Sequence, residues 1–579
     1  MIKDVDNMVQ GLRSLLSGLR IRRSDIGPDL VAGATFAIVN VPQGMANAVL
    51  AAANPVAGLY SLMIAMPVGA VFTSSVFMNV STTGALSVAA GDILSPLPEE
   101  QKLPTLIGLV MLIGLIQLGF GLLGLGRLIR FVSNAVMTGF LTGIAVLIML
   151  GALRDVTGYA SRQPNPLLRL ADTAMNWRLF DMPTLGLGLA TVALIFAFHR
   201  TALRKFALLL ALVVATIVAF VAMRITNWGT MTLVGDVASI PRSLPVPHMP
   251  SLEALPELLF PALAIALIGL IQGAGVGQSY PNPDGNFPDT SRDFKGQGLA
   301  NLAASFFGAI PSGGSISGTA ICVQAGARTR WTNIFAGAFI VVIVVFLAGL
   351  VALVPMAGLG GLLLVVGYQN IQPENIRNVW RTGRSARLIM CLTLAATLVV
   401  PLQYAILAGV VLSFVSQVLR SANDVVIREI LLVDGGFPHE GPVPAQLKPG
   451  QVTALRVSGS LFFASALELE RQLPATENAR GTAVILILRD IDDLGSTVIR
   501  VLKRYAQNLQ QQGGKLVLAG VNETLLGQLQ RTGVTDLIGI GNLFPAKAEI
   551  GFALNQAILA AKQWTASAAS ESDRTTGSR

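Results

Sequence analysis

The residues best suited to chemistry lie in one run of small and hydroxyl-bearing residues, IPSGGSISGTAICVQAGARTR, from Ile310 to Arg330. The run becomes apolar only from Ala320 to Ala325, which is about two turns of helix. We interpret it as a half-helix with a polar N-terminus, because exposed N–H groups and the positive end of a helix dipole suit an anion. The residues that we assign to anion binding here are Ser315, Ser317, Gly318 and Thr319.

A second stretch, Met78 to Leu94, repeats this design, with Ser81, Thr82 and Thr83 ahead of a short apolar run. Inside a membrane, such an element is tolerated only where protein or a water-filled cavity satisfies its backbone. Paired interrupted segments in the two halves of a chain indicate the midplane site of a secondary transporter. The alternative is that the hydroxyls only cap helices.

Two glutamines occupy comparable places in the two halves, Gln43 within VPQGMA and Gln272 within LIQGAGV. Their amides could contact a substrate, or they could only hold neighbouring helices together. Gly273, Gly275 and Gly277 superficially suggest a nucleotide loop. No strand precedes them, so close helix packing is the better interpretation.

The composition defines the class of protein that must position these residues. Hydrophobic residues make up 53% of the 579, charged residues make up 13%, and the mean hydropathy is +0.64. These values exclude an ordinary soluble enzyme and indicate a polytopic membrane protein. The net charge of +9 comes from basic residues scattered between apolar spans, so we expect no nucleic-acid partner. Two cysteines and three widely spaced histidines predict no metal site, and we expect no cofactor.

Fourteen apolar segments are long enough to span or half-span a bilayer, seven in each half of the chain. In both halves the third segment is the short one, as expected for two inverted repeats with an odd number of spans. A Pro-rich loop, 241–256, separates the halves. The segments are 29–48, 55–73, 82–94, 104–123, 129–151, 182–198 and 206–225, then 257–279, 296–310, 318–327, 331–353, 357–371, 386–400 and 402–420.

The loop charges predict the orientation of the chain. Lys and Arg gather in loops that follow even-numbered segments, for example Arg377 and Arg381 after the twelfth, whereas the other loops are acidic or mixed. Because positive charge accumulates on the cytoplasmic side of short loops, both termini are predicted to be cytoplasmic. Residues 1–27 form a basic amphipathic segment without the features of a cleaved leader. We expect the protein in a cell membrane, with the bacterial inner membrane as the first choice.

Beyond Arg420 the composition becomes that of a small soluble α/β domain. A linker rich in Gly and Pro, 422–450, leads to the domain at 451–564, and a polar tail at 565–579 is expected to be disordered. Alternating strands and helices favour a mixed sheet with helices on one side. The predicted strands are 452–463, 482–488 and 515–519, and the predicted helices are 496–512 and 523–531.

These residues together resemble the sulfate permease family, known in animals as solute carrier family 26. The resemblance rests on LVAGATFAIVNVPQGMANAV in the first span, on GLANLAASFFGAIPSGGSISGTAICVQAGARTR in spans nine and ten, and on the C-terminal domain. In that domain, LILRDIDDLGSTVIRVLKRYAQNLQQQGGKLVLAG is similar to a STAS domain, the module shared with anti-sigma-factor antagonists. Nucleobase permeases share the fold of seven plus seven spans, but their pattern lacks a STAS domain.

The resemblance implies that residues 28–421 form a core domain and a gate domain that move against each other. It further implies a homodimer and an anion held between the N-termini of spans three and ten. Carried over residue by residue, the site comprises Gln43, Ser81, Thr82, Thr83, Gln272, Ser315, Ser317, Gly318 and Thr319. Ser496 stands where the antagonists carry a phosphorylatable serine, although Ser496 is also an ordinary first residue of a helix.

Three departures from the family pattern bear on the mechanism. Many members have Gly-Pro in place of Ser81-Thr82, a Glu in place of Gln272 and an Arg in place of Gly318. The joint loss of a buried carboxylate and a buried Arg leaves the local charge unchanged. We therefore predict transport that is not coupled to protons through a carboxylate of span eight.

The sequence thus predicts a secondary transporter, not an enzyme, that carries a small anion by an elevator-like alternation. Sulfate is the first choice of substrate, and bicarbonate, chloride, nitrate and dicarboxylates remain open. Two alternatives belong to other classes. One is a nucleobase or neutral-solute permease on the same fold. The other is a sensor or scaffold regulated by the STAS domain, which could also bind a cytoplasmic protein partner.

Overall fold

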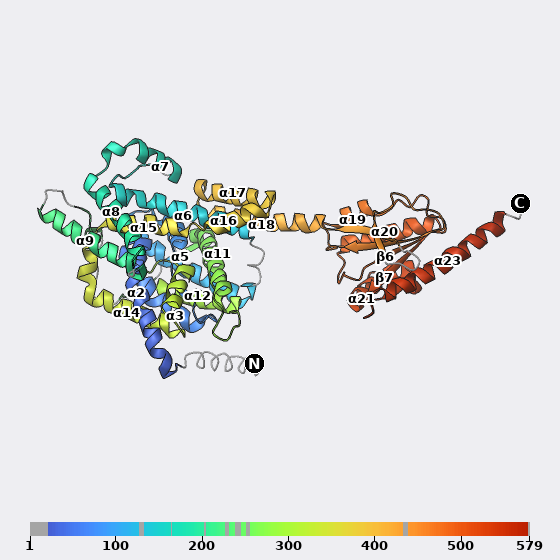
Figure 1. Ribbon diagram of the computed structural model, residues 1–579, viewed down its shortest axis with the longest axis horizontal. Coiled ribbons are helices and arrows are strands. Elements are labelled where there is room, and N and C mark those ends of the chain that lie inside the picture. Colours follow the sequence, from blue (N-terminus) through green and yellow to red (C-terminus); the bar gives the residue numbers. More distant parts are fainter. Residues whose placement is uncertain are drawn as a thin grey trace. The chain divides into compact units, whose positions relative to one another are not determined.

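The computed structural model describes residues 21–126, 133–163, 165–201, 204–225, 231–237, 245–249, 255–431 and 438–576. The chain divides into two compact units, Met1–Ser413 and Phe414–Arg579 (Figure 1). The predicted N-terminal segment lies outside the described residues as far as Arg20, and the first described helix begins at Arg23 rather than at position 29. Most of the Pro-rich loop at 241–256 also lies outside the described residues.

Each predicted apolar segment coincides with a helix, and the helices of the first unit pack as two bundles (Figure 1). The core bundle contains α2 (Arg23–Leu50), α3 (Pro55–Phe72), α4 (Gly84–Leu94), α5 (Glu99–Leu122), α11 (Leu255–Ser279), α12 (Thr290–Ser305), α13 (Ile316–Gln324) and α14 (Trp331–Ala352). The gate bundle contains α6 (Asn134–Thr157), α8 (Met182–His199), α9 (Ala207–Ile225), α15 (Met356–Asn370), α17 (Arg384–Val399) and the first part of α18 (Leu402–Asn423). The short helices α7 (Pro166–Met175), α10 (Val234–Val237) and α16 (Pro373–Thr382) lie in the connections.

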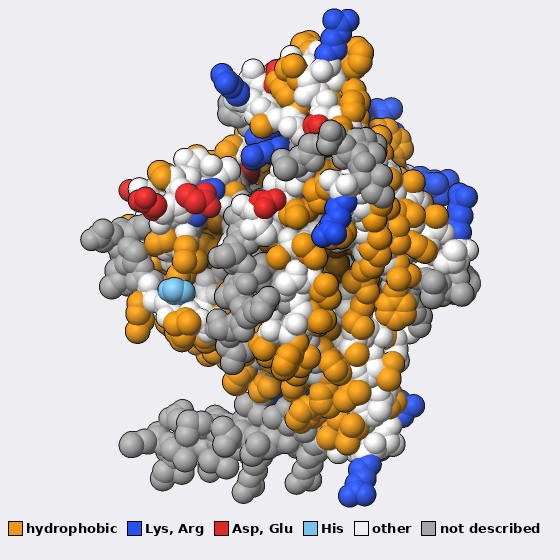
Figure 2. Space-filling model, turned by 90° about the vertical axis from the view of Figure 1, so that its left-hand side faces the viewer, with side chains coloured by type: hydrophobic (Ala, Val, Ile, Leu, Met, Phe, Trp, Pro, Cys, Tyr) orange, Lys and Arg blue, Asp and Glu red, His pale blue; other side chains and the backbone are white. Residues whose placement is uncertain are grey.

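Apolar helices dominate this unit. Among the described residues, α3, α5, α6, α8, α9 and α11 are long and apolar enough to cross a membrane, and α4 and the first part of α14 are shorter apolar helices. Hydrophobic side chains cover a broad area of the face that carries α8, α9 and α14, with most Lys and Arg toward its margins (Figure 2). The unit therefore has the surface of a multi-pass membrane protein, whereas the number of fourteen crossings stays a prediction.

Glycines allow the helices of each bundle to approach closely. A Cβ added to Gly114 of α5 would lie 2.8 Å from the carbonyl oxygen of Gly298 in α12. In the gate bundle, a Cβ added to Gly361 of α15 would lie 2.5 Å from the carbonyl oxygen of Gly188 in α8. Such contacts between small residues are the main way in which helices associate inside a bilayer, because lipid gives little hydrophobic drive.

Two short strands cross the core bundle directly before its two half-helices. β1 (Asn79–Thr82) precedes α4, and β2 (Ser312–Ser315) precedes α13. The strands pair antiparallel, and all of their residues are buried. We call this pair the β1–β2 ribbon. The two interrupted segments expected from the sequence are therefore strand–helix units, since much of each polar run is extended backbone instead of helix.

The second unit is built on a six-stranded sheet of order β4-β3-β5-β6-β7-β8. Strands β5 to β8 pair in parallel, and β3 and β4 extend the sheet antiparallel. The strands are β3 (Val426–Leu431), β4 (His439–Gly441), β5 (Val452–Ser458), β6 (Ala483–Ile487), β7 (Lys515–Val521) and β8 (Leu543–Pro545). The helices are α19 (Ala466–Gln472), α20 (Ser496–Gln511), α21 (Glu523–Arg531), α22 (Val534–Ile538) and α23 (Phe552–Thr576).

Three features of this unit differ from the expectation. Strands β3 and β4 lie inside the predicted linker at 422–450, because Val426–Leu431 pairs with both β4 and β5. Helices cover both faces of the sheet instead of one, since α20 packs on one face and α23 packs Ala557 against the other. Helix α23 also continues to Thr576, beyond the start of the predicted disordered tail, because Trp564 and its neighbours pack onto that second face.

Candidate functional site

The β1–β2 ribbon determines where the two helix N-termini lie. Because the strands are antiparallel, α4 leaves from the end where Thr82 pairs with Ser312, and α13 leaves from the end where Asn79 pairs with Ser315. Three residue steps of about 3.3 Å separate these pairs, so the two ends of the ribbon are roughly 10 Å apart. The positive ends of both helix dipoles therefore lie at the ribbon, with the helices extending away from it.

Residues with hydroxyl side chains surround the start of α13. Ser315 caps the helix, because its Oγ accepts a hydrogen bond from the Gly318 N–H at 3.0 Å, and it also lies 3.3 Å from Ser317 Oγ. Thr319 is completely buried, and its hydroxyl donates to the Ser315 carbonyl oxygen at 2.7 Å and accepts from the Asn79 N–H at 3.0 Å. Ser317, by contrast, is exposed. Of these residues, Ser317 is the one best placed to meet a solute.

The start of α4 is closed by side-chain hydrogen bonds. Thr83 caps this helix by accepting from the Leu86 N–H at 3.4 Å, and its hydroxyl donates to Gln272 Oε1 at 3.0 Å. Thr82 is buried and accepts from Asn47 Nδ2 at 3.0 Å. Thr83 and Gln272, each predicted separately as a site residue, are thus brought together from segments far apart in the chain.

Two other predicted residues have less defined surroundings. Ser81 is buried in β1 opposite Gly313, and its hydroxyl forms no hydrogen bond with the described residues. Gln43 is half-buried in α2, and its amide likewise has no hydrogen-bond partner among the described residues. The structure therefore connects neither side chain to the Ser315–Ser317 cluster by a hydrogen bond.

Buried amides that the sequence analysis did not single out hold the ribbon. Asn301 of α12 binds both backbone groups of Ser312, donating to its carbonyl oxygen at 2.8 Å and accepting from its N–H at 2.9 Å. Gln297 accepts from the Gly314 N–H at 3.1 Å. Asn333 of α14 accepts from Asn79 Nδ2 at 2.7 Å. For Asn333 the available signal was a polar amide within an otherwise apolar helix, because such a group needs a partner there. Helix α12 itself contains several polar residues, so Asn301 and Gln297 gave no such signal.

Close packing of glycines places α11 against the ribbon. A Cβ added to Gly314 would lie 2.5 Å from the Cα of Gly273, and a Cβ added to Gly313 would lie 3.1 Å from the Cα of Gly269. This contact agrees with the interpretation of Gly273 as a packing residue. Because Gln272 lies between these two α11 glycines, the same contact brings its side chain to Thr83.

A cavity of about 510 Å³ lies between the two bundles beside the start of α13. Ile316, Ile271 and Gly275 line its core-bundle wall, and Thr138 and Thr142 of α6 line the opposite wall. None of the described side chains that line it carries a charge. Exposed Ser317 follows Ile316 directly, so the cavity approaches the hydroxyl cluster at α13.

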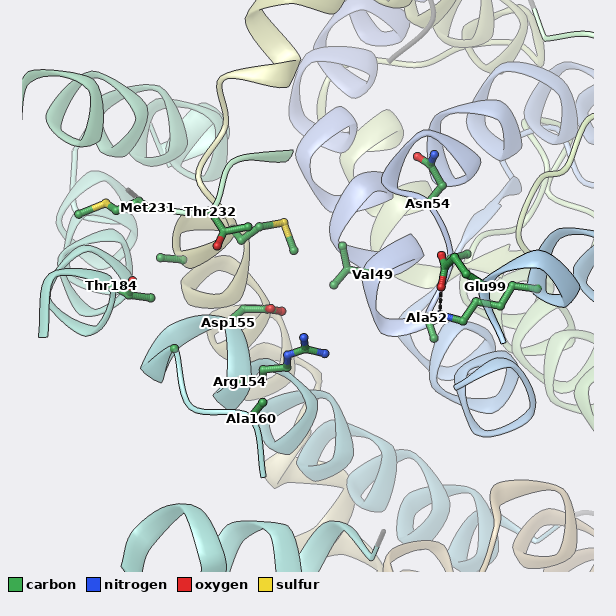
Figure 3. Close-up of a pocket in the computed structure, with 15 residues that line it drawn as sticks. Val49, Ala52, Asn54, Glu99, Arg154, Asp155, Ala160, Thr184, Met231 and Thr232 are labelled. Atoms are coloured by element: carbon green, nitrogen blue, oxygen red, sulfur yellow. Dashed lines mark hydrogen bonds and ion pairs between the residues drawn. The ribbon is translucent and has the colours of Figure 1, made fainter. Parts of the chain in front are cut away.

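A second cleft of about 490 Å³ separates the bundles beside the C-terminal ends of α2 and α6 (Figure 3). The first cavity lies beside the other end of α6. Arg154 and Asp155 of α6 lie on one wall, and Glu99 and Lys102 of α5 lie on the other, where they form an ion pair of 2.6 Å. The Arg154 side chain points into the space between the walls (Figure 3). In the predicted topology this cleft lies on the outer side, so the two cavities are on opposite sides of the ribbon.

The described residues offer no alternative centre for metal chemistry, since they contain no group of three or more His, Cys, Asp or Glu side chains that could hold an ion. The chemistry available at the ribbon is that of N–H and hydroxyl donors without formal charge. Such an arrangement can bind an anion or a polar solute.

Comparison with known proteins identifies the class. Residues 26–393 match the model of the sulfate permease family, and residues 444–550 match the STAS domain. The chain belongs to the sulfate permease family. It is 27% identical over 530 residues to YvdB of Bacillus subtilis, covering 90% of this chain and 96% of that protein. It is 26% identical over 566 residues to the bicarbonate transporter BicA of Synechocystis, covering 93% and 96%.

Solved structures confirm the fold. The murine solute carrier 26 family member A9, an anion transporter in the inward-facing state, superposes with a TM-score of 0.84 at 19% identity and covers 96% of this chain and 95% of its own. The transmembrane domain of a cyanobacterial BicA superposes with a TM-score of 0.58 at 23% identity and covers 68% of this chain and 98% of its own. The predicted class, a polytopic helical membrane protein with a C-terminal STAS domain, is thereby confirmed.

Proposed function

We propose that this protein is a secondary transporter of small inorganic or carboxylate anions, with sulfate as the first candidate and bicarbonate, chloride, nitrate and dicarboxylates as alternatives. The observation that supports this most is the β1–β2 ribbon, which places two helix N-termini at its two ends, about 10 Å apart, with the α13 end next to an uncharged cavity. Helix N-termini bind anions through N–H groups and the dipole. A site without a fixed cation also releases its anion readily, as a carrier requires.

In this proposal the anion is bound by backbone N–H groups at the starts of α4 and α13, and the hydroxyls of Ser315 and Ser317 replace part of its hydration shell. Thr319 holds the backbone of the ribbon, because its hydroxyl binds the Ser315 carbonyl oxygen, and Thr82 connects the ribbon to α2 through the Asn47 side chain. Gly318 lets the start of α13 pack closely on β1, since a Cβ there would lie 2.8 Å from Asn79 Oδ1. The core bundle then carries the site past the gate bundle, so that it opens to each side in turn.

Proton coupling through α11 is not part of this mechanism. Gln272 is an amide and binds the Thr83 hydroxyl, so this position has no carboxylate to carry a proton. We expect exchange or facilitated movement of the anion that is insensitive to a proton gradient. Stoichiometric acidification of liposomes during uptake would contradict this.

The decisive experiment combines ligand binding with a change at Ser317. Purified protein is screened by thermal shift against sulfate, bicarbonate, chloride, nitrate, oxalate, fumarate, uracil and xanthine, because a ligand that binds only the folded state stabilises it. We expect one anion to stabilise the protein and Ser317→Leu to abolish both the shift and liposome uptake without lowering the unliganded melting temperature. Ser24→Leu, at the exposed start of α2, is the matched control. Stabilisation by a nucleobase alone would favour the other permease class.

Several further features complete the proposal. We place the protein in the bacterial inner membrane as a homodimer with both termini in the cytoplasm. The STAS domain is then positioned to bind a cytoplasmic protein. Ser496 is exposed at the first position of α20, which makes it accessible to a kinase.

A further inference from the structure

An apolar groove runs along the junction of the two bundles and belongs to neither cavity described above. It has a volume of about 860 Å³ and is formed by α2 and α14 of the core bundle and α9 of the gate bundle. These helices lie on or beside the broad hydrophobic face (Figure 2). The lining residues are Ala34, Ile38, Val41, Pro42, Met45, Leu209, Leu212, Val213, Thr216, Ile217, Phe220, Phe339, Val342, Ile343, Leu347, Leu350, Leu353 and Val354.

The groove has no unsatisfied polar group for an aqueous solute. Its one polar lining side chain, Thr216, donates its hydroxyl to the Leu212 carbonyl oxygen of its own helix at 2.8 Å. Many of the hydrophobic walls remain exposed, for example Ile217 at 57% and Leu350 at 63%. The groove therefore fits a flexible hydrocarbon rather than the substrate.

The length of the groove suits one acyl chain. On α2 it extends from Ala34 to Met45, and on α9 from Leu209 to Phe220. Eleven residue steps of about 1.5 Å give roughly 16 Å in each case, about half of the roughly 30 Å hydrocarbon thickness. The predicted spans 29–48 and 206–225 place both stretches across the middle of the bilayer. An acyl chain that enters at the Phe220 end and fills the groove therefore reaches past the midplane.

A cation marks one end of the groove. The Arg224 guanidinium lies 4.5 Å from the centre of the Phe220 ring, which is itself a lining residue. Stacking on an aromatic face leaves the N–H edges of a guanidinium free to bind a phosphate. Among the described residues no carboxylate forms an ion pair with Arg224. In the predicted topology Arg224 lies on the outer side of the membrane. The preference of Lys and Arg for cytoplasmic loops therefore does not explain this side chain, and binding of a head group would.

We propose that this groove binds one phospholipid, with an acyl chain along α2, α9 and α14 and its phosphate on Arg224. The occupant lies where the core bundle must slide along the gate bundle. Its chain length and head group therefore influence how easily the two bundles move. The proposal depends on the position of these helices in a bilayer and not on which solute is transported.

Native mass spectrometry of the full-length protein, reconstituted with phosphatidylglycerol or phosphatidylcholine and then extracted in detergent, tests this inference. We expect the wild type to retain one phospholipid. Thr216→Trp fills the groove and should lower the lipid-bound fraction roughly tenfold, the factor that corresponds to about 1.4 kcal/mol. Leu115→Trp, on the exposed face of α5, should retain the lipid as the matched control.

Further variants test the role of the head group and the identity of the occupant. Arg224→Gln should remove any preference for phosphatidylglycerol while leaving the melting temperature unchanged. Thr216→Ala leaves the groove open and should retain the lipid, so it controls for misfolding of the Trp variant. Retention by Thr216→Trp equal to that of the wild type overturns the proposal. So does a groove occupied by a second copy, seen as cross-linking from Ile217→Cys that is lost in single-copy nanodiscs.

Discussion

The two strand–helix units use the same local design but differ in what their first hydroxyls contact. At α13, Ser315 and Ser317 bind only backbone and each other, and Ser317, which follows the cavity-lining Ile316, is exposed. At α4, Thr83 is bound to Gln272 and is half-buried. An inverted repeat can therefore place two equivalent helix N-termini at the two ends of one ribbon and still leave one end open and the other closed by a side chain.

The two strands also differ in how the surrounding helices hold them. β2 is bound through its backbone by Asn301 and Gln297 and packs directly on the α11 glycines. β1 is held through the side chains of Asn79 and Thr82, which bind Asn333 and Asn47, and through the Asn79 N–H, which donates to the Thr319 hydroxyl. The α13 half consequently has a backbone bound by side chains of neighbouring helices and an exposed hydroxyl at Ser317, whereas the α4 half depends more on contacts between side chains.

The largest expected effect follows from removing the backbone support of β2. Asn301→Leu leaves the Ser312 N–H and carbonyl buried without their partner, and each such group costs about 1–3 kcal/mol. We expect a loss of about 3 kcal/mol or more, measured as a large fall in the melting temperature of the detergent-purified protein. Gln297→Leu removes one bond to the ribbon and should cost less; the reverse order would contradict the assignment of Asn301 as the main support.

A somewhat smaller effect is expected from the glycine contact under the same strand. Gly314→Ala places a methyl group 2.5 Å from the Gly273 Cα, where backbone must shift. Overpacking of this kind costs about 1–3 kcal/mol. Thermal unfolding should detect it, and Gly119→Ala, which has open space around it, should be close to neutral. Equal stability of the two variants would show that the ribbon is not tightly packed against α11.

An intermediate effect should distinguish the closed half from the open one. Thr83→Val removes the donor to Gln272 Oε1, and we expect substrate affinity to fall severalfold while Ser317→Leu abolishes uptake. Thr35→Val, whose hydroxyl binds only its own helix, is the control. Dose-dependent thermal shifts would provide the affinities. If Gln272→Leu adds to Thr83→Val without any coupling in a double-mutant cycle, their hydrogen bond has no role in the site.

The smallest effect on the membrane site should come from the other unit. Ser496 is exposed, and Gly495 before it rather than a side chain occupies the cap position of α20. We expect Ser496→Glu to leave the melting temperature and the anion-induced shift nearly unchanged, while altering binding to a cytoplasmic partner. Mass spectrometry of protein from its native cell should find phosphate on Ser496; its absence under every growth condition would remove the regulatory hypothesis.

The sequence by itself determined the membrane class, the positions of the helices and the two polar segments between them. These properties follow from the local cost of burying polar groups in lipid, so they can be read from composition and segment length. The similarity of long stretches further indicated the family. The strands at 452–458 and 515–521 were also predictable within a few residues, because their burial pattern is local.

Only the tertiary structure decided which polar residues meet. The pairing of Asn79 with Ser315 and the support of Ser312 by Asn301 join segments whose proximity no local pattern encodes. The same holds for the end of α23, since residues 565–576 were predicted as part of a disordered tail, whereas the structure continues the helix whose earlier turns pack on the sheet. Long-range packing supplies the partner that makes a buried amide or a weakly apolar helix favourable, and that partner is known only once the chain is folded.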